Sequence, residues 1–275
     1  MRVDSHHHLW RYTPEEYGWI YDSMSILQRD FLPDDLAREA SAAGIDAAVA
    51  VQARQTLEET RWLLELAAES GVIRGVVGWA PIDADDFPAT LESLRQNPLL
   101  KGLRHVVQAE PDGFLDAPDF NRGIASLQPT GVVYDVLIFA RQLAEATRFV
   151  NRHPDQSFVL DHIAKPDIKS DGFASWKVAI RELARRDNVA CKLSGMVTEA
   201  DWQTWSPAQL KPYFDTVLEA FGPSRLMFGS DWPVLTIACS YTRWSETVDA
   251  WLAPLSADER AQIQGETATR IYSLT

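Results

Sequence analysis

Short apolar runs alternate with amphipathic stretches along the whole chain of 275 residues. Several runs are hydrophobic at every position, which is typical of strands buried on both faces of a parallel sheet. The runs recur at about the spacing of one strand and one helix. Eight strands are predicted on this basis, at residues 2–8, 46–52, 74–80, 101–107, 132–138, 157–162, 189–194 and 226–231.

Helix start signals lie between these runs. Pro33 opens one predicted helix, and Thr56 and Glu59 have the spacing of a capping box before another. Ser206 and Ser256 begin two later helices in the same way. The helical stretches therefore separate the predicted strands, as in repeated strand–helix units.

Eight such units without a low-complexity linker predict an α/β fold, a single (β/α)8 TIM-type barrel domain of residues 1–275. The alternative is an open, doubly wound sheet. That fold usually carries a glycine-rich phosphate-binding turn after its first strand. Here the first strand runs into three histidines, so the barrel is favoured.

Charge and cysteine content narrow the possible partners. A formal net charge of −13 makes nucleic acid an unfavourable partner. The two cysteines, Cys191 and Cys239, form no disulfide framework, which is typical of a reducing compartment. The sequence has no signal-peptide pattern and no apolar run long enough to span a bilayer. A cytoplasmic protein without a membrane partner is expected, and a homo-oligomer remains open.

The end of the first strand carries the first candidate site residues, because catalytic groups of barrels lie at the C-terminal ends of strands. His6 and His8 end this strand, and simple alternation places Asp4 on their face and His7 on the other. Two imidazoles at this spacing can bind one metal ion. A single buried histidine would more often be a hydrogen-bonded core residue, but the pair favours a site.

Three further strand ends are polar. Asp231 ends strand eight, and a carboxylate there requires a metal, a histidinium or a water as its partner. His162 ends strand six and is a candidate metal ligand or proton-transfer group. Ser194 ends strand seven without the sharp elbow of a hydrolase nucleophile, so a hydrogen-bonding role is expected.

Two basic residues are candidate substrate-binding groups. Arg104 on strand four requires an anion, either a substrate or the carboxylate of a neighbouring strand such as Asp135. Lys165 follows strand six and could bind substrate oxygens or remain a solvated loop lysine. Both alternatives stay open for each residue.

Aromatic residues gather after the strand ends. Trp10, Trp79 and Trp232 could wall a pocket and stack on a ring. The aromatic loop of residues 12–32 follows the first strand and is a candidate lid.

Five segments together resemble the amidohydrolase superfamily. The resemblance is to its amidohydrolase 2 branch, which includes sugar lactonases of the L-fuconolactonase and L-rhamnonolactonase type. It covers nearly the whole chain and implies a distorted (β/α)8 barrel. The segments are DSHHHLW (4–10), GLRH (102–105), DHIAKP (161–166), KLSG (192–195) and FGSDWP (228–233).

The resemblance implies one reacting centre and a set of residues around it. The resemblance implies at most one divalent metal ion at this centre, zinc or manganese, and is also compatible with a metal-free site. Binuclear members carry a lysine or glutamate at strand four and a histidine at strand five, which this chain lacks, so a two-metal site is not expected. Implied metal ligands are His6, His8, His162 and Asp231, and implied substrate-binding residues are Arg104, Lys165, Trp10, Trp232 and Ser194.

The expected activity is hydrolysis of a sugar-derived lactone, a small-molecule substrate, to its aldonic acid. Asp231 would act as general base on water, with His162 as the second catalytic group. The alternatives are a metal-dependent decarboxylase of an aromatic carboxylic acid and a non-enzymatic binding protein on a degenerate barrel. The complete set of histidines and aspartate disfavours the binding protein.

The C-terminal segment departs from the resembled pattern at one position. Thr267 stands where the family usually has asparagine, in the segment 267–272 that ends in Tyr272. This position is expected to lie away from the site and to affect packing rather than chemistry.

Overall fold

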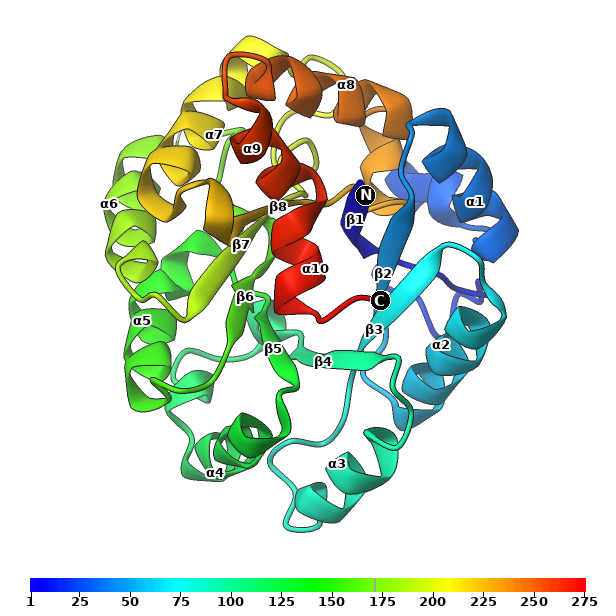
Figure 1. Cartoon of the computed structure of the whole chain (residues 1–275), viewed down its shortest axis with the longest axis vertical. Helices are drawn as coiled ribbons and strands as arrows, with labels where there is room; N and C mark the ends of the chain where they lie inside the picture. Colours follow the sequence, from blue (N-terminus) through cyan, green and yellow to red (C-terminus); the bar gives the residue numbers. More distant parts are fainter. Residues whose placement is uncertain (171) are drawn as a thin grey trace.

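The computed structural model describes residues 1–170 and 172–275. Eight parallel strands form one sheet in the order β1 to β8. Backbone hydrogen bonds from Asp231 to His6 and from His8 to Trp232 join the last strand end to the first. The sheet therefore nearly closes into a barrel with the helices around it (Figure 1). The predicted (β/α)8 fold is confirmed, and the open sheet is not formed.

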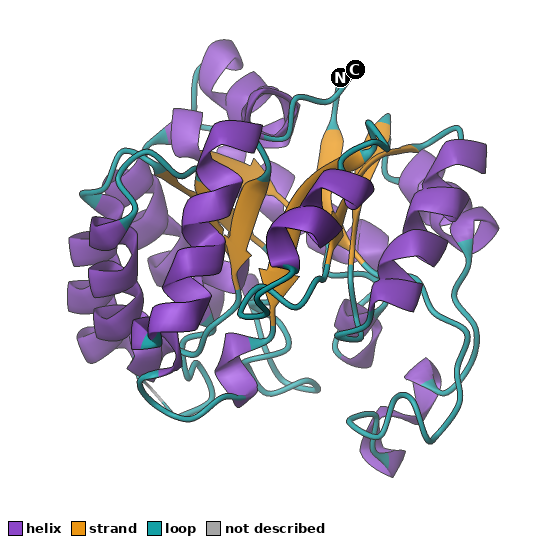
Figure 2. Ribbon diagram, turned by 90° about the horizontal axis from the view of Figure 1, so that it is seen from below, coloured by secondary structure: helices purple, strands orange, loops and turns teal. Residues whose placement is uncertain are grey.

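All eight predicted strands are present, and each is shorter at one or both ends than predicted. The strand arrows point to one end of the barrel, and both chain termini lie at the other (Figure 2). The strands are β1 (Val3–His7), β2 (Ala47–Val51), β3 (Ile73–Gly78), β4 (Leu100–His105), β5 (Val133–Val136), β6 (Phe158–Leu160), β7 (Val189–Leu193) and β8 (Leu226–Phe228).

The predicted helix starts are also found. The Ser206 and Ser256 side chains accept hydrogen bonds from the backbone three residues later, at the starts of α7 and α9. A π-helical turn, Gln262–Glu266, separates α9 from α10, which lies across the barrel axis in Figure 1. The helices are α1 (Pro33–Ala42), α2 (Leu57–Glu69), α3 (Phe87–Leu94), α4 (Pro118–Leu127), α5 (Leu143–Arg152), α6 (Phe173–Ala184), α7 (Pro207–Phe221), α8 (Tyr241–Leu252), α9 (Ala257–Ala261) and α10 (Thr267–Ile271).

A β-bulge interrupts β1. Between Asp4 and His7 this strand advances three residues, while its partner β2 advances two, from Ala48 to Ala50. The extra residue breaks the alternation of side chains between the two faces. The prediction that Asp4 shares a face with the two site histidines of this strand is therefore wrong.

Asp4 instead links the first strand to the residues that follow the last strand. Its carboxylate accepts hydrogen bonds from the backbone and the hydroxyl of Ser230, at 2.8 and 2.6 Å. Tyr241 of α8 donates a third at 2.8 Å. Burial raises the pKa of Asp4 although these bonds oppose the rise. Asp4 is thus a structural residue outside the barrel interior.

The barrel interior below the site is filled with small and β-branched residues. Val3, Val49 and Val133 are among the strand residues of this cluster, and Tyr272 from the C-terminal segment packs against them. The Tyr272 hydroxyl donates to Asp135 of β5. Thr267 donates to the Pro223 carbonyl, away from the strand ends, as expected. The C-terminal segment therefore closes the end of the barrel opposite the site.

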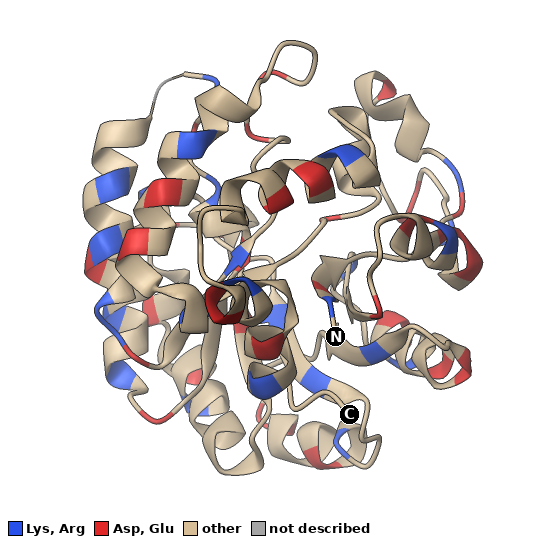
Figure 3. Cartoon of the chain, turned by 45° about the horizontal axis from the view of Figure 1, so that its top comes forward, with Lys and Arg blue, Asp and Glu red and all other residues tan. Residues whose placement is uncertain are grey.

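The outer surface is highly charged. Figure 3 shows acidic and basic residues interspersed over the outer helices. Within the described ranges, 1–170 and 172–275, the structure contains no helix with the length and apolar character needed to cross a membrane.

The start of α2 carries a buried carboxylate. Thr56 caps this helix, accepting from the Glu59 backbone N–H. The Glu59 side chain does not complete a capping box; it accepts hydrogen bonds from the backbone of Ala53 and Arg54. Because Glu59 is completely buried, its pKa rises to about 7.

This raised pKa predicts a pH-dependent stability. The ordinary pKa of a glutamate is 4.5, so the folded state keeps the Glu59 proton over a range in which the unfolded chain loses it. The contribution of Glu59 to the free energy of unfolding is therefore largest below pH 4.5. This contribution, about 3 kcal/mol, is lost as the pH rises through about 7. We expect Glu59→Gln to reduce the fall in unfolding free energy between pH 5 and pH 8, measured by urea denaturation.

The matched control is Glu58→Gln on the exposed face of the same helix. It should keep the wild-type dependence on pH. Equal pH dependence in both variants would contradict the assignment to Glu59.

Candidate active site

The histidines of β1 meet Asp231 at the C-terminal ends of the strands. The Nε2 atoms of His6 and His8 are 3.2 Å apart. Asp231 Oδ1 lies 3.8 Å from the first nitrogen and 3.4 Å from the second. Neighbouring ligand atoms on a tetrahedral zinc ion are about 3.3 Å apart, given bonds of about 2.0 Å. The three buried side chains therefore fit one such ion in both chemistry and spacing.

His8 has a fixed orientation. Its Nδ1 lies 2.7 Å from the Val51 carbonyl oxygen. A carbonyl can only accept, so Nδ1 carries a proton, and Nε2 is the nitrogen that can bind an ion. This arrangement, a carbonyl behind the ring and a free nitrogen in front, is typical of a metal-ligating histidine.

His162 approaches from the other side of the site. Its Nε2 lies 3.9 Å from Asp231 Oδ1, and its Nδ1 lies 2.8 Å from Ser194 Oγ. The four residues expected around the centre do converge, but they divide into two overlapping groups. In the described part of the chain, the potential metal-binding groups are His6–His8–Asp231 and His6–Asp161–His162.

The backbone is unusual at both places where these side chains enter the site. Asp231 has φ 60°, and the four residues from His162 to Lys165 all have positive φ. Non-glycine residues in this region are strained, and such strain clusters at functional sites. Gly195 lies against the His162 ring, and a Cβ there would come within 2.6 Å of it. The position of the ring therefore requires glycine.

A buried ionic network lies beneath the histidines. Lys192 Nζ is 3.0 Å from Asp161 Oδ1 and 2.5 Å from Asp135 Oδ2. Arg104 Nη1 is 2.9 Å from Asp161 Oδ2. The alternative in which Arg104 pairs with Asp135 is therefore wrong. Asp135 pairs with Lys192 of β7 instead.

Sequence reasoning did not assign roles to Asp161 or Lys192, and it considered Asp135 only as a partner of Arg104. A signal was available, because each is an isolated charge within or directly after a strand of apolar residues. Buried charges are rarely left unpaired, so opposite charges on adjacent strands indicate an internal network.

Burial and these charges set the protonation states. Burial lowers the pKa of His162 to about 3, so this ring is neutral at pH 7. Burial alone would raise the pKa of Asp231, but His162 and His8 outweigh it and the net pKa lies below the ordinary value. The site thus combines an ionised carboxylate with a neutral imidazole.

A cavity of about 360 Å³ opens above these residues. Its polar lining includes Arg104 and Lys165 in addition to the catalytic candidates. Lys165 Nζ lies 3.8 Å from Glu199, too far for a direct hydrogen bond. Ser194 is completely buried and bonds to the His162 ring. Apolar lining residues are Trp19, Ala53, Val106, Ala109, Leu137 and Val234.

The three tryptophans predicted to wall the pocket are not among its described lining residues. Trp79 donates its indole N–H to His105 Nδ1. The Trp10 indole is completely buried and donates to the Arg29 carbonyl. Both Trp10 and Trp232 pack edge-on against Phe31. The aromatic loop folds back onto β1 and buries both indoles, so Trp19 is the tryptophan that lines the cavity in the described chain.

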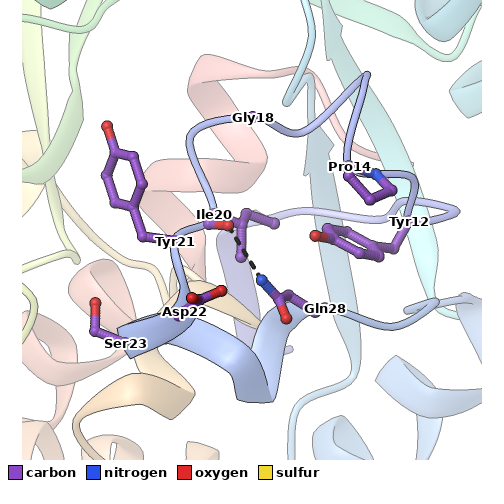
Figure 4. A pocket seen from close by; sticks show the side chains of 8 residues that line it. All are labelled: Tyr12, Pro14, Gly18, Ile20, Tyr21, Asp22, Ser23 and Gln28. Carbon is purple, nitrogen blue, oxygen red and sulfur yellow. Dashed lines mark hydrogen bonds between the residues drawn. The ribbon is translucent and has the colours of Figure 1, made fainter.

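The loop that carries Trp19 has internal structure of its own. It contains a 3-10 helix, Asp22–Leu27, and a hollow on its surface (Figure 4). The Gln28 amide donates to the Ile20 carbonyl across this hollow, at 3.3 Å, and Tyr21 points outward. Asp22 is the one charged residue among the described lining residues of this hollow.

Known proteins resemble the whole chain. Residues 3–274 match the model of the family Amidohydro_2, described as amidohydrolase. An L-fucono-1,5-lactonase of Burkholderia multivorans is 44% identical, over 100% of this chain and 96% of that protein. An L-fucono-1,5-lactonase of Burkholderia ambifaria is 34% identical, with the same coverage of both chains.

A crystal structure of an amidohydrolase from Burkholderia multivorans with bound zinc has the same fold. It superposes on this chain with a TM-score of 0.97, at 44% identity, and the match covers 100% of both chains. The zinc in that protein agrees with the fit of His6, His8 and Asp231 to such an ion.

This geometry predicts zinc binding with one ion per chain. His8→Ala removes one of three proposed ligand atoms, so we expect zinc affinity to fall by more than the 10–100-fold that is usual for an outer-shell change. Competition against a chromogenic chelator measures the affinity, and elemental analysis measures the stoichiometry.

The control is His153→Ala, since His153 bonds to Asn121 away from the site. It should bind zinc as the wild type does. Unchanged zinc affinity in His8→Ala would show that the ion binds elsewhere.

Proposed function

The chain belongs to the amidohydrolase family, and we propose that it is a lactonase that hydrolyses a sugar-derived lactone, L-fucono-1,5-lactone or a close relative, to the aldonic acid. The observation that carries the proposal is the ionised Asp231 beside the neutral His162 at a cavity of about 360 Å³. A cavity of this size suits a small molecule such as a single sugar ring. The names of the two lactonase relatives support the same substrate class.

Asp231 is the proposed general base. It takes a proton from a water molecule as the water oxygen bonds to the lactone carbonyl carbon. The resulting tetrahedral intermediate collapses by breaking the bond from that carbon to the ring oxygen. The protonated Asp231 returns its proton to this leaving oxygen, which becomes a hydroxyl of the open-chain acid.

His162 stabilises the carbonyl oxygen while this occurs. If the Ser194 hydroxyl donates to Nδ1 at 2.8 Å, the proton of the neutral ring lies on Nε2, which faces Asp231. That N–H is a fixed donor for the oxygen that gains negative charge. Gly195 leaves room for the ring, since a Cβ at this position would come within 2.6 Å of it.

A divalent ion fits the same mechanism. When bound by His6, His8 and Asp231, zinc or manganese supplies a positive charge that polarises a carbonyl oxygen. The chain's own part is to hold the two imidazoles in place, with Nε2 of each turned to Asp231.

The cavity walls suit a partly deoxygenated sugar. Lys165 lines the cavity, with Glu199 at 3.8 Å as its ion-pair partner in the described part of the chain, and can bind hydroxyls of the substrate. Val106, Leu137 and Val234 offer an apolar surface for a methyl group, as found in a 6-deoxy sugar. Trp19 can stack on the ring.

Decarboxylation of an aromatic acid fits the site less well. Such an enzyme needs a clamp for the substrate carboxylate, and Arg104 is the natural candidate. Both of its terminal nitrogens are already bonded, Nη1 to Asp161 and Nη2 to Gln52. A fork of two free N–H donors is therefore not presented to the cavity.

Replacement of the base tests the proposal. We expect Asp231→Asn to lower kcat/KM for L-fucono-1,5-lactone by about 10²–10⁴-fold, the usual contribution of a general base. Acid release monitored with a pH indicator gives the rate. Asp155→Asn, an exposed carboxylate in the loop before β6, is the control and should keep wild-type activity.

The same preparation is assayed for carbon dioxide release from a dihydroxybenzoate. Lactone turnover without carbon dioxide release supports the lactonase. Carbon dioxide release without lactone turnover would falsify it, and full lactonase activity in Asp231→Asn would remove Asp231 as the base.

A further inference from the structure

The wall of the 360 Å³ cavity contains one uncharged polar side chain outside the catalytic group, that of Gln108. Its amide offers an oxygen acceptor and two N–H donors. The Oε1 atom is buried and has no hydrogen-bond partner among the described residues. Buried polar atoms are nearly always paired, so an unpaired amide at a cavity is a candidate for contact with a ligand.

Gln108 is less constrained than the other lining residue with an unpaired atom. Among the described lining residues, Arg104 also has a buried atom without a partner, its Nε. However, its two terminal nitrogens are bonded to Asp161 and Gln52, and its side chain is almost completely buried. Gln108 is only partly buried, and the soft torsion of an amide group lets Oε1 turn toward the cavity. The Gln108 amide is therefore available to a substrate.

The backbone that carries this amide is fixed. Gln108 lies in the 3-10 turn Val107–Ala109, and its N–H donates to the Leu137 carbonyl after β5 at 3.0 Å. The Gln142 side chain donates to the Val107 carbonyl, also at 3.0 Å. A side chain on a fixed backbone loses less freedom when it binds a ligand, which favours selective contacts.

Gln108 lies across the barrel from the proposed base. Gln108 follows β4, whereas Asp231 follows β8. The eight strands are in sequential order around the nearly closed sheet, so β4 and β8 face each other across it (Figure 1). In a six-membered lactone, C4 is the ring carbon farthest from the carbonyl carbon, and C3 is next to it. With the carbonyl carbon beside Asp231, the hydroxyls on C3 and C4 lie toward Gln108.

We propose that Gln108 is a specificity-determining residue that binds a ring hydroxyl of the lactone, at C3 or C4. A hydroxyl both donates and accepts, so it pairs with either end of the amide. The neighbouring lining residues Val106 and Ala109 have apolar side chains. A substrate without this hydroxyl therefore leaves the amide unpaired, and a site built in this way discriminates against it. The inference rests on the proposed lactonase and adds which part of the substrate is recognised.

The test measures the binding of lactams, in which an N–H group replaces the ring oxygen and resists hydrolysis. The probes are L-fucono-1,5-lactam and its 2-deoxy, 3-deoxy and 4-deoxy forms, and isothermal titration calorimetry gives the affinities. The wild type should bind the 3-deoxy or the 4-deoxy lactam about 10–100-fold more weakly than the parent. Gln108→Leu should bind the parent and that deoxy lactam with equal affinity. The ratio of parent to 2-deoxy affinity should be the same in both proteins.

The control is Gln209→Leu on the exposed first turn of α7, which should keep all wild-type ratios. A merely structural role of Gln108 would weaken the binding of all four lactams by one factor. Unchanged ratios in Gln108→Leu, a change at C2 alone, or no binding of the parent lactam to the wild type would overturn the proposal. If Gln108→Leu fails to fold, Gln108→Ala removes the same amide and replaces it in the test.

The acid-release assay judges the lactonase separately. Acid release by the wild type, together with unchanged lactam ratios in Gln108→Leu, would remove the role of Gln108 and leave the lactonase in place. Altered lactam ratios without acid release would remove the lactonase and leave Gln108 as a residue that binds a ring hydroxyl.

Discussion

The pairing of buried charges inside the barrel is the constraint on which the site depends. Lys192 lies between Asp161 and Asp135, and Arg104 pairs with Asp161 from the other side. Removing one partner of a buried ion pair typically costs about 3–5 kcal/mol, because a charge is then left unpaired in the interior. These four side chains come from β4, from β5, from β7 and from the turn directly after β6. Their pairing therefore fixes the relative positions of the strand ends that carry the site.

Strained turns at the strand ends carry two of the site residues. His162 and Asp231 both have positive φ, which costs of order 1–3 kcal/mol for each residue. The ring of His162 is held by Ser194, and the absence of a side chain at Gly195 leaves room for it. Asp231 is held by its backbone bond to His6 across the seam. With these backbone conformations, the carboxylate of Asp231 and the imidazole of His162 both line the cavity.

The charged network contacts one of the two site histidines of β1. His8 lies with its Nδ1 against a backbone carbonyl. His6 lies against both a cation and a carboxylate of the network. The same buried charges therefore connect neighbouring strands of the barrel and contact a histidine of the candidate site.

Local sequence patterns were sufficient for the eight strands, the barrel and the convergence of His6, His8, His162 and Asp231, because each pattern marks the end of a buried strand. They did not reveal the bulge that turns Asp4 outward, since an inserted residue changes no local hydrophobic pattern. The pairing of Lys192 with Asp161 and Asp135, and the burial of Trp10 by its own loop, also came from the tertiary structure alone. Hydrophobic periodicity is a property of neighbouring residues, whereas the partner of a buried charge depends on barrel register and closure.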